Sequence, residues 1–311
     1  MYYLLRRIIC ALAALLVVIT ATFLFMHAIP GGPFQRDKAL PEAIKKNIEA
    51  RYKLDQPLHL QYADYLSHLA RGDLGPSYRY RGQGVNEIIK SRFPVSAQLG
   101  GVALLIALLL GVSAGILAAL HRNRFIDYLV GFFSTLGAAV PSFIAGTLLI
   151  YYLSYRWGLL PAARWGSPKQ VIMPALALAG MPAATIARLT RDRLLEVFDQ
   201  DYIKTAVAKG LTRRRIIWVH AFKNAVLPVV TYLGPLAAGI LSGTFVVENI
   251  FAVPGLGKHF VTGICNRDYT LVLGVTVFYC VLLIFANLLV DLLYPLLDPR
   301  IQPGPAGKER A

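Results

Sequence analysis

The chain has 311 residues, of which 56% are hydrophobic and only 16% are charged, and its mean hydropathy is +0.53. Soluble domains carry charge on about 25% of their residues, so this composition excludes an ordinary soluble protein and indicates a chain that lies in lipid. The net charge of +15 would point to nucleic acid only if the cations formed one patch or stripe. The three cysteines, Cys10, Cys265 and Cys280, are expected to act as small hydrophobic residues, since they form no disulfide framework and no CxxC metal site.

The first apolar stretch runs from Ile8 to Ile29 and follows the pair Arg6 and Arg7. A secretion signal begins in a similar way, but its apolar region is only about 7 to 15 residues long. No small-residue cleavage site follows the stretch before Pro30. We therefore expect residues 1–30 to form a retained transmembrane helix.

Residues 31–94 are predicted to fold as a small helical extracytoplasmic subdomain. Helix-compatible spacing runs from Pro41 to Lys53, and apolar side chains recur at i, i+3, i+4 and i+7 in Tyr62, Tyr65, Leu66 and Leu69. A Gly-rich turn region follows from Arg71 to Pro76, and after it comes Tyr78 to Arg81. The subdomain is either a lid on the helix ends or a landing surface for an outside partner.

Five further stretches are apolar and long enough to span a bilayer, which takes around 20 residues. These are Val95 to Leu120, Tyr128 to Leu153, Val171 to Ala187, Ala225 to Val247 and Leu271 to Leu297. The stretch that starts at Val171 is the weakest, because it is short and contains Pro174, Gly180 and Pro182. Kinks are expected where proline removes a helix hydrogen bond, at Pro141, Pro228 and Pro235.

Two pairs of glycines lie one helical turn apart inside these stretches, Gly111 with Gly115 and Gly239 with Gly243. Small residues at this spacing let helix backbones approach closely. Each pair therefore serves either packing within the chain or an interface with a second subunit.

The distribution of Lys and Arg tests this topology, because cytoplasmic loops of membrane proteins are enriched in these residues. With the amino terminus inside, cytoplasmic segments hold 16 of the 32, nine of them between Arg188 and Lys223. Short outer loops hold five, and the other 11 lie in the long segment 31–94, which is too long for its charge to govern orientation. The predicted fold is an all-α polytopic membrane protein with six transmembrane helices and both termini cytoplasmic, which explains the net charge without nucleic acid.

The cytoplasmic segment from Arg188 to Lys223 is too strongly patterned to be a linker. Asp199 or Asp201 is expected to cap a short helix, and Gly210 to supply its left-handed stop. The apolar face of that helix would consist of Ile203, Ala206 and Val207. A second amphipathic piece follows the run Arg213 to Arg215, with Ile216, Ile217 and His220 on one side. On pattern alone, this pair of helices either rests on lipid headgroups or contacts a partner protein.

The same segment resembles the EAA loop of bacterial ABC importer permeases, the coupling element that fits into a groove on a cytoplasmic ATPase. In that family Glu-Ala-Ala is followed by three residues and a Gly. Here Lys204 to Ala206 takes the place of Glu-Ala-Ala, with Gly210 at the matching distance. The departure at Lys204 is common in the peptide-importer branch, and residues 204–211 are similar to that branch.

Further resemblance to this family covers nearly the whole chain. The motifs that carry it are His27 to Phe34, Phe93 to Ser96, Val253 to Gly257, Asn266 to Tyr269 and Leu297 to Arg300. The stretch from Gly72 to Ser77 is similar to the B-type subunits of oligopeptide permeases in particular. Permeases for dipeptides, glutathione or nickel share most of the other motifs, so these substrates are alternatives.

The resemblance implies a type I permease fold in the bacterial cytoplasmic (inner) membrane. Residues 1–30 would be the first helix, 31–94 the extracytoplasmic subdomain, 95–300 the permease core with the coupling loop 188–224, and 301–311 a cytoplasmic tail. The chain would form half of the pathway of an oligopeptide importer, together with a second permease, two cytoplasmic ATPase subunits and an extracytoplasmic peptide-binding protein. It would catalyse no reaction and hold no cofactor, because ATP and magnesium would be bound by the ATPase subunits.

The residues expected to dock on the ATPase are Asp201, Lys204, Thr205, Ala206, Lys209, Gly210, Leu211, Arg214, Ile216 and Ile217. Apolar grip is expected from Ala206, Leu211 and Ile216, and steering from the arginines. The candidate outer gate consists of Glu248, Pro254, Gly255 and Gly257. Alternatively, Glu248 meets water and the segment that starts at Val253 is an ordinary turn.

Two other classes of protein fit these residues less well. A membrane enzyme would need a nucleophile or a metal set, yet the six histidines have no HExxH spacing, and neither a GxSxG serine nor a P-loop is present in the sequence. An ion-coupled carrier or channel would need ionisable residues buried at mid-bilayer. The expected spans are nearly free of them, and Asp291 with Asn287 near the inner end of the last span is expected to be a packing or interface feature.

Overall fold

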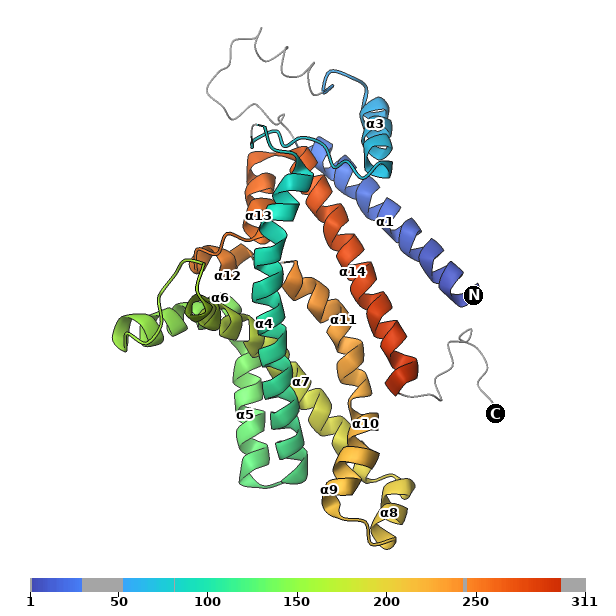
Figure 1. Ribbon diagram of the computed structural model, residues 1–311, viewed down its shortest axis with the longest axis vertical. Coiled ribbons are helices and arrows are strands. Elements are labelled where there is room, and N and C mark those ends of the chain that lie inside the picture. Colours follow the sequence, from blue (N-terminus) through green and yellow to red (C-terminus); the bar gives the residue numbers. More distant parts are fainter. Residues whose placement is uncertain (1, 30–52, 81, 243–244, 298–311) are drawn as a thin grey trace. The chain divides into compact units, whose positions relative to one another are not determined.

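The computed structural model describes residues 2–29, 53–80, 82–242 and 245–297, and these fold almost entirely into helices (Figure 1). The first half of the chain forms α1 (Tyr2–Ala28), α3 (Leu58–Ala70), α4 (Val85–Leu120), α5 (Phe125–Ala139), α6 (Ser142–Leu149) and the π-helix η1 (Ile150–Arg156). The second half forms α7 (Pro168–Phe198), α8 (Asp201–Ala208), α9 (Arg213–Arg215), the π-helix η2 (Ile216–Ala221), α10 (Phe222–Ala225), α11 (Leu227–Leu241), α12 (Phe245–Ile250), α13 (Leu256–Asn266) and α14 (Tyr269–Leu297). Across these described ranges the only β-type pairing is one isolated bridge, so the all-α expectation is confirmed for them. The helix expected from Pro41 to Lys53 lies almost wholly outside the described residues.

Four helices are long and apolar enough to cross a membrane, with spans at Ile9–Ala28, Val85–Leu120, Pro168–Phe198 and Tyr269–Leu292. Two bent pairs pass the same test together, Phe125–Ala139 with Ser142–Arg156 and Arg213–Ala225 with Leu227–Leu241. The described residues therefore contain four candidate spans, or up to six if each bent pair forms one span.

Proline explains both bends. The first pair is bent by 103°, and Pro141 stands between the end of α5 at Ala139 and the start of α6. The second pair is bent by 47°, and Pro228 lies in the first turn of α11. Because proline cannot donate the backbone hydrogen bond that would carry a helix through, the kinks expected at these two positions are confirmed. Pro235 lies inside α11, which continues to Leu241.

The weakest expected span forms the continuous helix α7, even though it contains Pro174 and Pro182. Within its most apolar window 61% of the residues are buried in the protein, against 17% for the first span. A helix that other helices cover needs less apolar surface than one that faces lipid. This burial explains why the sequence signal for α7 was weak.

The described chain divides into two compact units. Unit 1 comprises Met1–Val95 and Gly255–Val281, and unit 2 comprises Ser96–Pro254 and Leu282–Ala311. The boundaries fall inside α4 and α14, so each of these long helices contributes to both units.

In unit 1, α3 packs its apolar face on two membrane helices. Tyr62, Tyr65, Leu66 and Leu69 lie in one hydrophobic cluster with residues of α1 and α14, namely Leu15, Ile19, Phe23, Leu273 and Val277. The repeat of apolar side chains at i, i+3, i+4 and i+7 therefore predicted both the helix and its buried face correctly.

A second feature of unit 1 joins two sequence motifs that are about 190 residues apart. The side chain of Asp268, between α13 and α14, is fully buried and accepts hydrogen bonds from the hydroxyl of Ser77 and from the backbone N–H groups of Tyr78 and Arg79. It also accepts the backbone N–H of Leu271 and the hydroxyl of Thr270, each at 3.2 Å. A buried carboxylate is stable only with such donors, so Asp268 fixes the turn after α3 to the start of α14.

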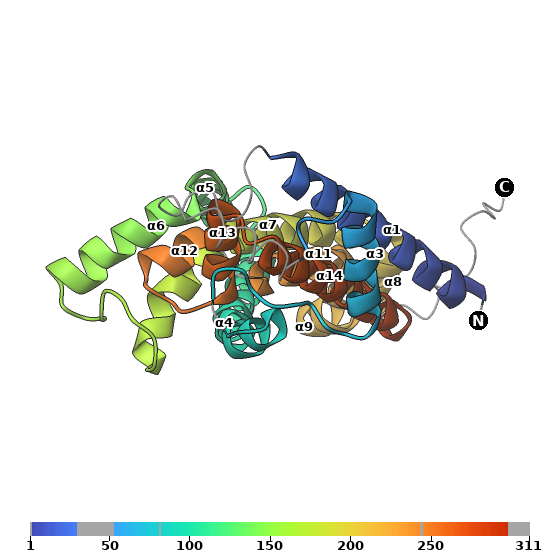
Figure 2. The ribbon, with the colours of Figure 1, turned by 90° about the horizontal axis from the view of Figure 1, so that it is seen from above.

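Unit 2 is organised around α7, which contacts α5, α6, α11, α10 and α12. Figure 2 shows α12 alongside α6, and these two helices are also in contact. A Cβ added at Gly111 of α4 would come within 2.7 Å of the Ala183 carbonyl oxygen of α7, and one added at Gly115 within 2.6 Å of the Ala187 carbonyl oxygen. This first glycine pair therefore serves close packing within the chain.

The second glycine pair behaves differently as far as it is described. A Cβ added at Gly239 of α11 would meet no described atom within 4 Å, and Gly243 lies outside the described residues. Close internal packing does not explain Gly239, and its role at an interface with a second subunit stays a prediction.

Candidate functional site

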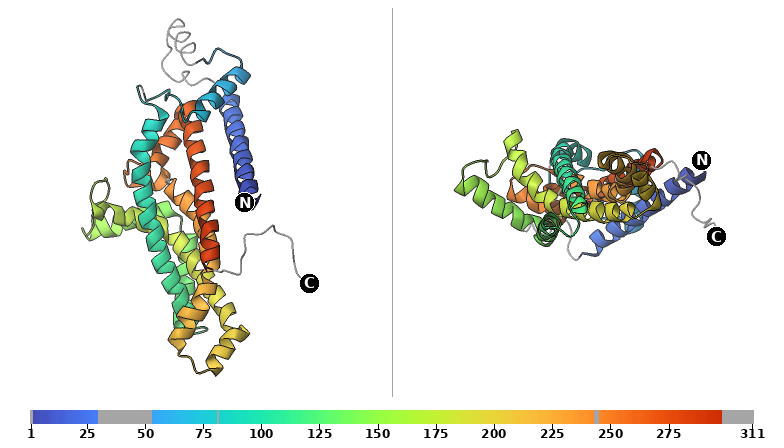
Figure 3. Two further views of the ribbon diagram at one scale, coloured as in Figure 1. Left: turned by 45° about the vertical axis from the view of Figure 1, so that its right-hand side comes forward. Right: turned by 90° about the horizontal axis from the view of Figure 1, so that it is seen from below.

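The basic segment between α7 and α11 folds into the short helices α8, α9, η2 and α10. In Figures 1 and 3 this group lies at the end of unit 2 where the turn between α4 and α5 also lies. The guanidinium of Arg213 donates a hydrogen bond to the carbonyl oxygen of Leu120, the last residue of α4, at 3.3 Å. The segment is thus a folded element attached to the helix ends. We refer to residues 199–223, the part of the expected loop 188–224 that follows α7, as the coupling loop.

The start of α8 differs from its predicted form. Gln200 occupies the N-cap position, so the prediction that Asp199 or Asp201 caps this helix is wrong. Asp199 instead ends α7, and Asp201 lies in the first turn of α8, where its carboxylate pairs with the Lys204 ammonium at 2.9 Å. A carboxylate in the first turn still interacts favourably with the helix dipole, although it makes no capping hydrogen bond.

The end of α8 is formed as predicted. Gly210 has φ +73°, and its N–H donates to the Val207 carbonyl oxygen at 2.9 Å. The N–H of Leu211 reaches the Ala206 carbonyl oxygen at 3.2 Å. Left-handed backbone after a helix is most easily adopted by glycine, so the stop expected at Gly210 is confirmed.

One side of the coupling loop packs on its own chain. Ile203, Ala206 and Ile216 are buried in a cluster with Ile116 and Ala119 of α4, Leu194 of α7, and Ala221 and Ala225. Ile217 is also buried, and Leu211 packs on the cluster while half-buried. Ala206 and Ile216 were expected to lie on the surface that grips a partner. They are instead buried and anchor the loop to its own chain.

The other side of the loop faces outward. Asp201, Lys204, Thr205, Lys209, Gly210 and Arg214 are exposed. Tyr202 and Val207 are exposed too, with Val207 at 59%, so the face combines apolar area with an excess of positive charge. The loop is therefore anchored to α4 and α7 on one side and exposed on the other.

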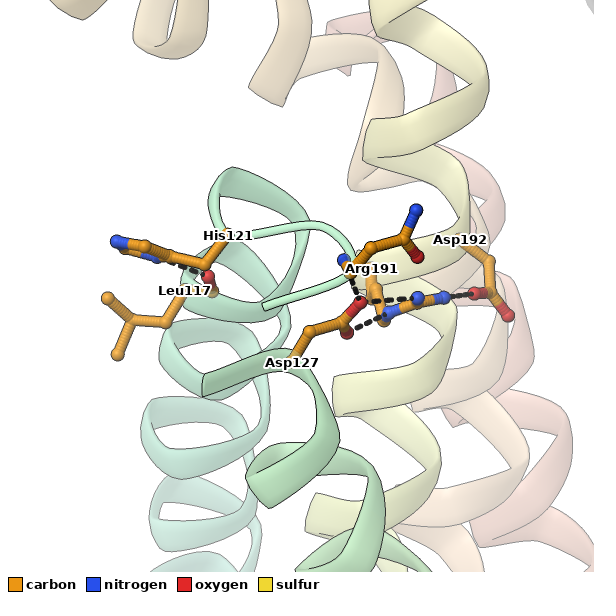
Figure 4. A network of polar contacts seen from close by, with 6 residues as sticks. Leu117, His121, Asp127, Arg191 and Asp192 are labelled. Carbon is orange, nitrogen blue, oxygen red and sulfur yellow. Dashed lines mark hydrogen bonds and ion pairs between the residues drawn. The ribbon is translucent and has the colours of Figure 1, made fainter. Parts of the chain in front are cut away.

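An ion pair with a buried carboxylate lies near this end of unit 2 and was not found by sequence reasoning (Figure 4). Asp127 in the first turn of α5 is only 6% exposed, and Arg191 of α7 binds its two carboxylate oxygens at 2.6 and 2.9 Å. Asp127 also accepts the N–H of Asn123 at 3.0 Å, and Arg191 extends to Asp192 at 3.0 Å. The only sequence signal is that Asp127 and Arg191 have opposite charges and lie just beyond the expected cytoplasmic ends of two spans. The pair ties the α4–α5 turn to the helix that leads into the coupling loop.

Replacing Arg191 by methionine is expected to lower the melting temperature of the purified protein in detergent, because the buried Asp127 carboxylate would lose two charge-assisted hydrogen bonds. Such bonds contribute roughly 2 kcal/mol of stability. The matched control is Arg193→Met, which breaks an exposed pair with Glu196 that is worth less than about 1 kcal/mol. Equal melting temperatures for the two variants would contradict the role given to Arg191. A double variant that also carries Asp127→Leu should recover part of the loss.

The four candidate gate residues are divided between the two units. Glu248 of α12 is completely buried, accepts a hydrogen bond from the Ser96 hydroxyl at 2.7 Å and receives the Val253 N–H on its backbone carbonyl at 2.7 Å. The alternative in which Glu248 meets water is therefore wrong for this structure. Pro254 is half-buried in unit 2.

Gly255 and Gly257 belong to unit 1, at the N-cap and in the first turn of α13, and both are buried. Beside them, the His259 ring is bonded to the Gly255 carbonyl oxygen at 3.0 Å. Burial lowers the pKa of the His259 imidazole; the bond to Gly255 opposes this, and the nearby charges of Arg92 and Lys258 lower it further. His259 is therefore expected to be neutral at pH 7.

Within residues 2–29, 53–80, 82–242 and 245–297, no three His, Cys, Asp or Glu side chains are grouped so that they could hold a metal ion.

Comparison with protein families relates most of the chain to membrane transport components. The model described as "Binding-protein-dependent transport system inner membrane component" matches residues 111–303, and the corresponding N-terminal model matches residues 1–100. The chain is 48% identical over 300 residues to the dipeptide transport system permease protein DppB of Bacillus subtilis, with 96% of this chain and 97% of that protein covered. It is 44% identical over 302 residues to the oligopeptide transport system permease protein OppB of Salmonella typhimurium, covering 96% and 99%.

Two solved structures have a similar fold at low sequence identity. The inward-facing MetNI methionine ABC transporter matches with a TM-score of 0.56 at 17% identity, covering 68% of this chain and 96% of the matched one. An amino acid ABC transporter crystallised with histidines matches with a TM-score of 0.53 at 17% identity, covering 70% and 95%.

Proposed function

The chain belongs to the family of binding-protein-dependent transport system inner membrane components, and from this premise we propose that it is a permease subunit of an ATP-driven peptide importer and forms half of its translocation pathway. It is a multi-pass protein of the cytoplasmic membrane. Membership in this family favours an importer permease over an ion-coupled carrier, a channel or a membrane enzyme. In this proposal the chain itself catalyses no reaction, and ATP and magnesium are bound by two cytoplasmic ATPase subunits.

Six transmembrane helices with both termini cytoplasmic are proposed, which counts each bent pair as one span. The enrichment of Lys and Arg between residues 188 and 223 supports this orientation. Residues 31–94 would form the extracytoplasmic subdomain and residues 95–300 the core, with 301–311 as a cytoplasmic tail. Packing of α3 on α1 and α14 favours a lid over a free landing surface for that subdomain.

The observation that carries the proposal is the two-sided coupling loop. Its outward side, with Lys204, Val207 and Lys209, would dock on an ATPase subunit, and its buried side, with Ile203 and Ala206, would anchor it to α4 and α7. A partner can move the helices only through an element that is held firmly on one side and accessible on the other. Closure of the ATPase subunits would then turn unit 2 as a body between inward-open and outward-open states.

The ion pair of Asp127 with Arg191 supports the same mechanism. It joins α5 to α7 close to the coupling loop, so a displacement of the loop would reach both helices. Glu248, Pro254, Gly255 and Gly257 stay candidates for the outer gate. Burial of Glu248 beside Ser96 fits a closed gate. Opening of the gate would expose the Glu248 carboxylate.

Peptides are the proposed substrates, because relatives that match over nearly their full length are named as dipeptide and oligopeptide permeases. An oligopeptide importer is the first candidate, since the stretch from Gly72 to Ser77 is similar to the B-type oligopeptide subunits. A dipeptide importer is the second, and the 48% identity to the Bacillus subtilis dipeptide permease favours it. The importer would also contain a second permease and an extracytoplasmic peptide-binding protein.

The proposal is tested by purifying the tagged chain from membranes of its own cells in mild detergent and identifying the attached subunits. We expect an ATP-hydrolysing protein and a second permease in the complex, and ATP-dependent uptake of labelled peptides after reconstitution with the binding protein. Uptake by the chain alone, driven by an ion gradient, would contradict the proposal, as would a complex that lacks any ATPase.

A further inference from the structure

Unit 1 contains a cavity of about 210 Å³ that the proposed transport mechanism does not use. It lies between α1, α3, the turn after α3 and the start of α14. Its apolar walls come from Phe23, Tyr269 and Leu273, and its polar lining includes His27, Asp64 and Tyr65. The volume of the cavity is far above the roughly 10–15 Å³ that one water molecule needs, so the space admits a small polar group.

The hydroxyl of Tyr65 is the first indication that this cavity binds a ligand. The side chain is 9% exposed, and its hydroxyl has no hydrogen-bond partner within the described part of the chain. Burial raises the pKa of this phenol, so it stays protonated and able to donate. The neighbouring Tyr62 differs, because its hydroxyl shares a 2.6 Å hydrogen bond with Thr20. A buried hydroxyl without a partner destabilises the folded protein, and a ligand that bonds to it would remove that cost.

Opposite charges line the solvent side of the same cavity. The ammonium of Lys53 lies 2.7 Å from the carboxylate of Asp64, and these side chains are 49% and 39% exposed. Because neither side chain is deeply buried, each can give up its contact with the other and bind a charged group of a ligand instead. The pair offers one site for a cation and one for an anion.

His27 also lines the cavity, and both of its ring nitrogens have partners within unit 1. Its Nδ1 lies 2.8 Å from the Phe23 carbonyl oxygen, and its Nε2 lies 3.3 Å from the side-chain oxygen of Gln61. The amide nitrogen of Gln61 donates to the carbonyl oxygens of Leu54 and Gln56, which fixes its oxygen toward the imidazole.

The position of the cavity along the chain indicates its level relative to lipid. His27 is the penultimate residue of the candidate span Ile9–Ala28, and Tyr269 is the first residue of the candidate span Tyr269–Leu292. Both lining residues thus mark the level at which a span meets the aqueous side. Tyrosines are enriched at this level of membrane proteins, where lipid headgroups are the most abundant polar groups.

We propose that this cavity binds a zwitterionic group, with an ammonium and an anionic oxygen a few bonds apart, as found in a phosphatidylethanolamine headgroup and in a free dipeptide. The ammonium would lie against Asp64 and the aromatic rings of Phe23 and Tyr269, and the anion against Lys53 and the hydroxyl of Tyr65. This inference does not rest on the proposed transport function, because it concerns binding to the chain itself.

The test is isothermal titration calorimetry of the delipidated full chain in a maltoside detergent, with dihexanoyl phosphatidylethanolamine, dihexanoyl phosphatidylglycerol and dialanine as the three probes. We expect saturable binding of a zwitterion and at least about tenfold weaker binding of phosphatidylglycerol, which lacks the ammonium. Binding of phosphatidylethanolamine alone identifies a lipid as the source. Binding of dialanine alone identifies a free zwitterion, and this too supports the site.

Tyr65→Phe is expected to weaken binding about tenfold, as the loss of one buried hydrogen bond implies. Asp64→Asn should weaken it in the same direction by removing the charge that holds the ammonium. Tyr62→Phe is the matched control, since its hydroxyl is bonded to Thr20 and it does not line the cavity. Without ligand, Tyr65→Phe should melt no lower than the unmodified chain, which shows that a loss of binding is not a loss of folding. The proposal is overturned if neither zwitterion binds, if phosphatidylglycerol binds equally well, or if Tyr65→Phe leaves binding unchanged.

Discussion

Replacing Gly210 by glutamate is expected to abolish both association with the ATPase and peptide uptake, while the chain still inserts into the membrane. Gly210 stands at the exposed end of α8 with φ +73°, and a Cβ added there would meet no described atom within 4 Å. The substitution is therefore compatible with the folded chain apart from backbone strain of roughly 1–2 kcal/mol. A negative charge in the bend of a positively charged docking surface should weaken association roughly 100-fold or more, because a misplaced charge at an interface costs several kcal/mol.

Two control variants separate docking from folding in this experiment. Gly158→Glu introduces the same side chain at another exposed glycine with φ +63° and open space around it, but outside the coupling loop. Gly210→Asn keeps the loop but adds only a small neutral side chain that tolerates left-handed backbone. Both controls should retain the ATPase on co-purification and support uptake. Normal uptake by Gly210→Glu, or an equal loss in Gly158→Glu, would count against the docking role.

Asp268→Ala is expected to prevent accumulation of folded protein. The carboxylate is fully buried and accepts bonds from three backbone N–H groups and two hydroxyls, so its removal would leave buried donors without acceptors in both joined segments. Each buried donor left without an acceptor costs roughly 1–3 kcal/mol, so several of them together cost a large part of the stability of a typical domain. The measurements are the yield of monodisperse protein in detergent and its melting temperature.

A graded series of substitutions tests whether stability depends on the carboxylate of Asp268 itself. Asp268→Asn retains one acceptor oxygen but loses the charge, so it should melt between the unmodified chain and Asp268→Ala. Asp73→Ala removes an exposed carboxylate in the same turn region, where it accepts only the Gly75 N–H among the contacts described for it, and it should change stability by less than about 1 kcal/mol. If Asp268→Ala had the same melting temperature as Asp73→Ala, the hydrogen bonds of Asp268 would not stabilise the fold, which would contradict this role.

Local pattern predicted the helices and breaks that depend on residues close in the chain. The apolar repeat through Tyr65 predicted the face that α3 buries, and Gly210 ended α8 as expected. Pro141 marked the bend between α5 and α6, although its size of 103° could not be read from the sequence. In each case the sequence signal lies in residues within one or two helical turns of one another, although the surface that covers the α3 face comes from α1 and α14.

Local pattern failed where the answer depended on which neighbour covers a face. Ala206, Leu211 and Ile216 were expected to grip a partner, yet Ala206 and Ile216 are buried in a cluster with residues of α4 and α7, and Leu211 packs on it. The ion pair of Asp127 with Arg191 joins residues 64 apart, and the expected boundary of the third span placed Asp127 outside the apolar stretch. Periodicity shows that a helix has a face to bury, but it does not identify the surface that buries it.

The sequence by itself determined that this chain lies in a membrane and to which family it belongs. It also determined the main apolar helices and the presence of a patterned basic segment between α7 and α11. Hydropathy, charge distribution and motif order are properties of the linear chain, and lipid enforces helical backbone wherever the chain crosses it. Only the tertiary structure decided the bonding of Asp268 to the Gly72–Ser77 motif, the division of the coupling loop into anchored and outward sides, and the cavity beside Tyr65. These features depend on contacts between residues far apart in the chain, and such contacts exist only after the helices have packed.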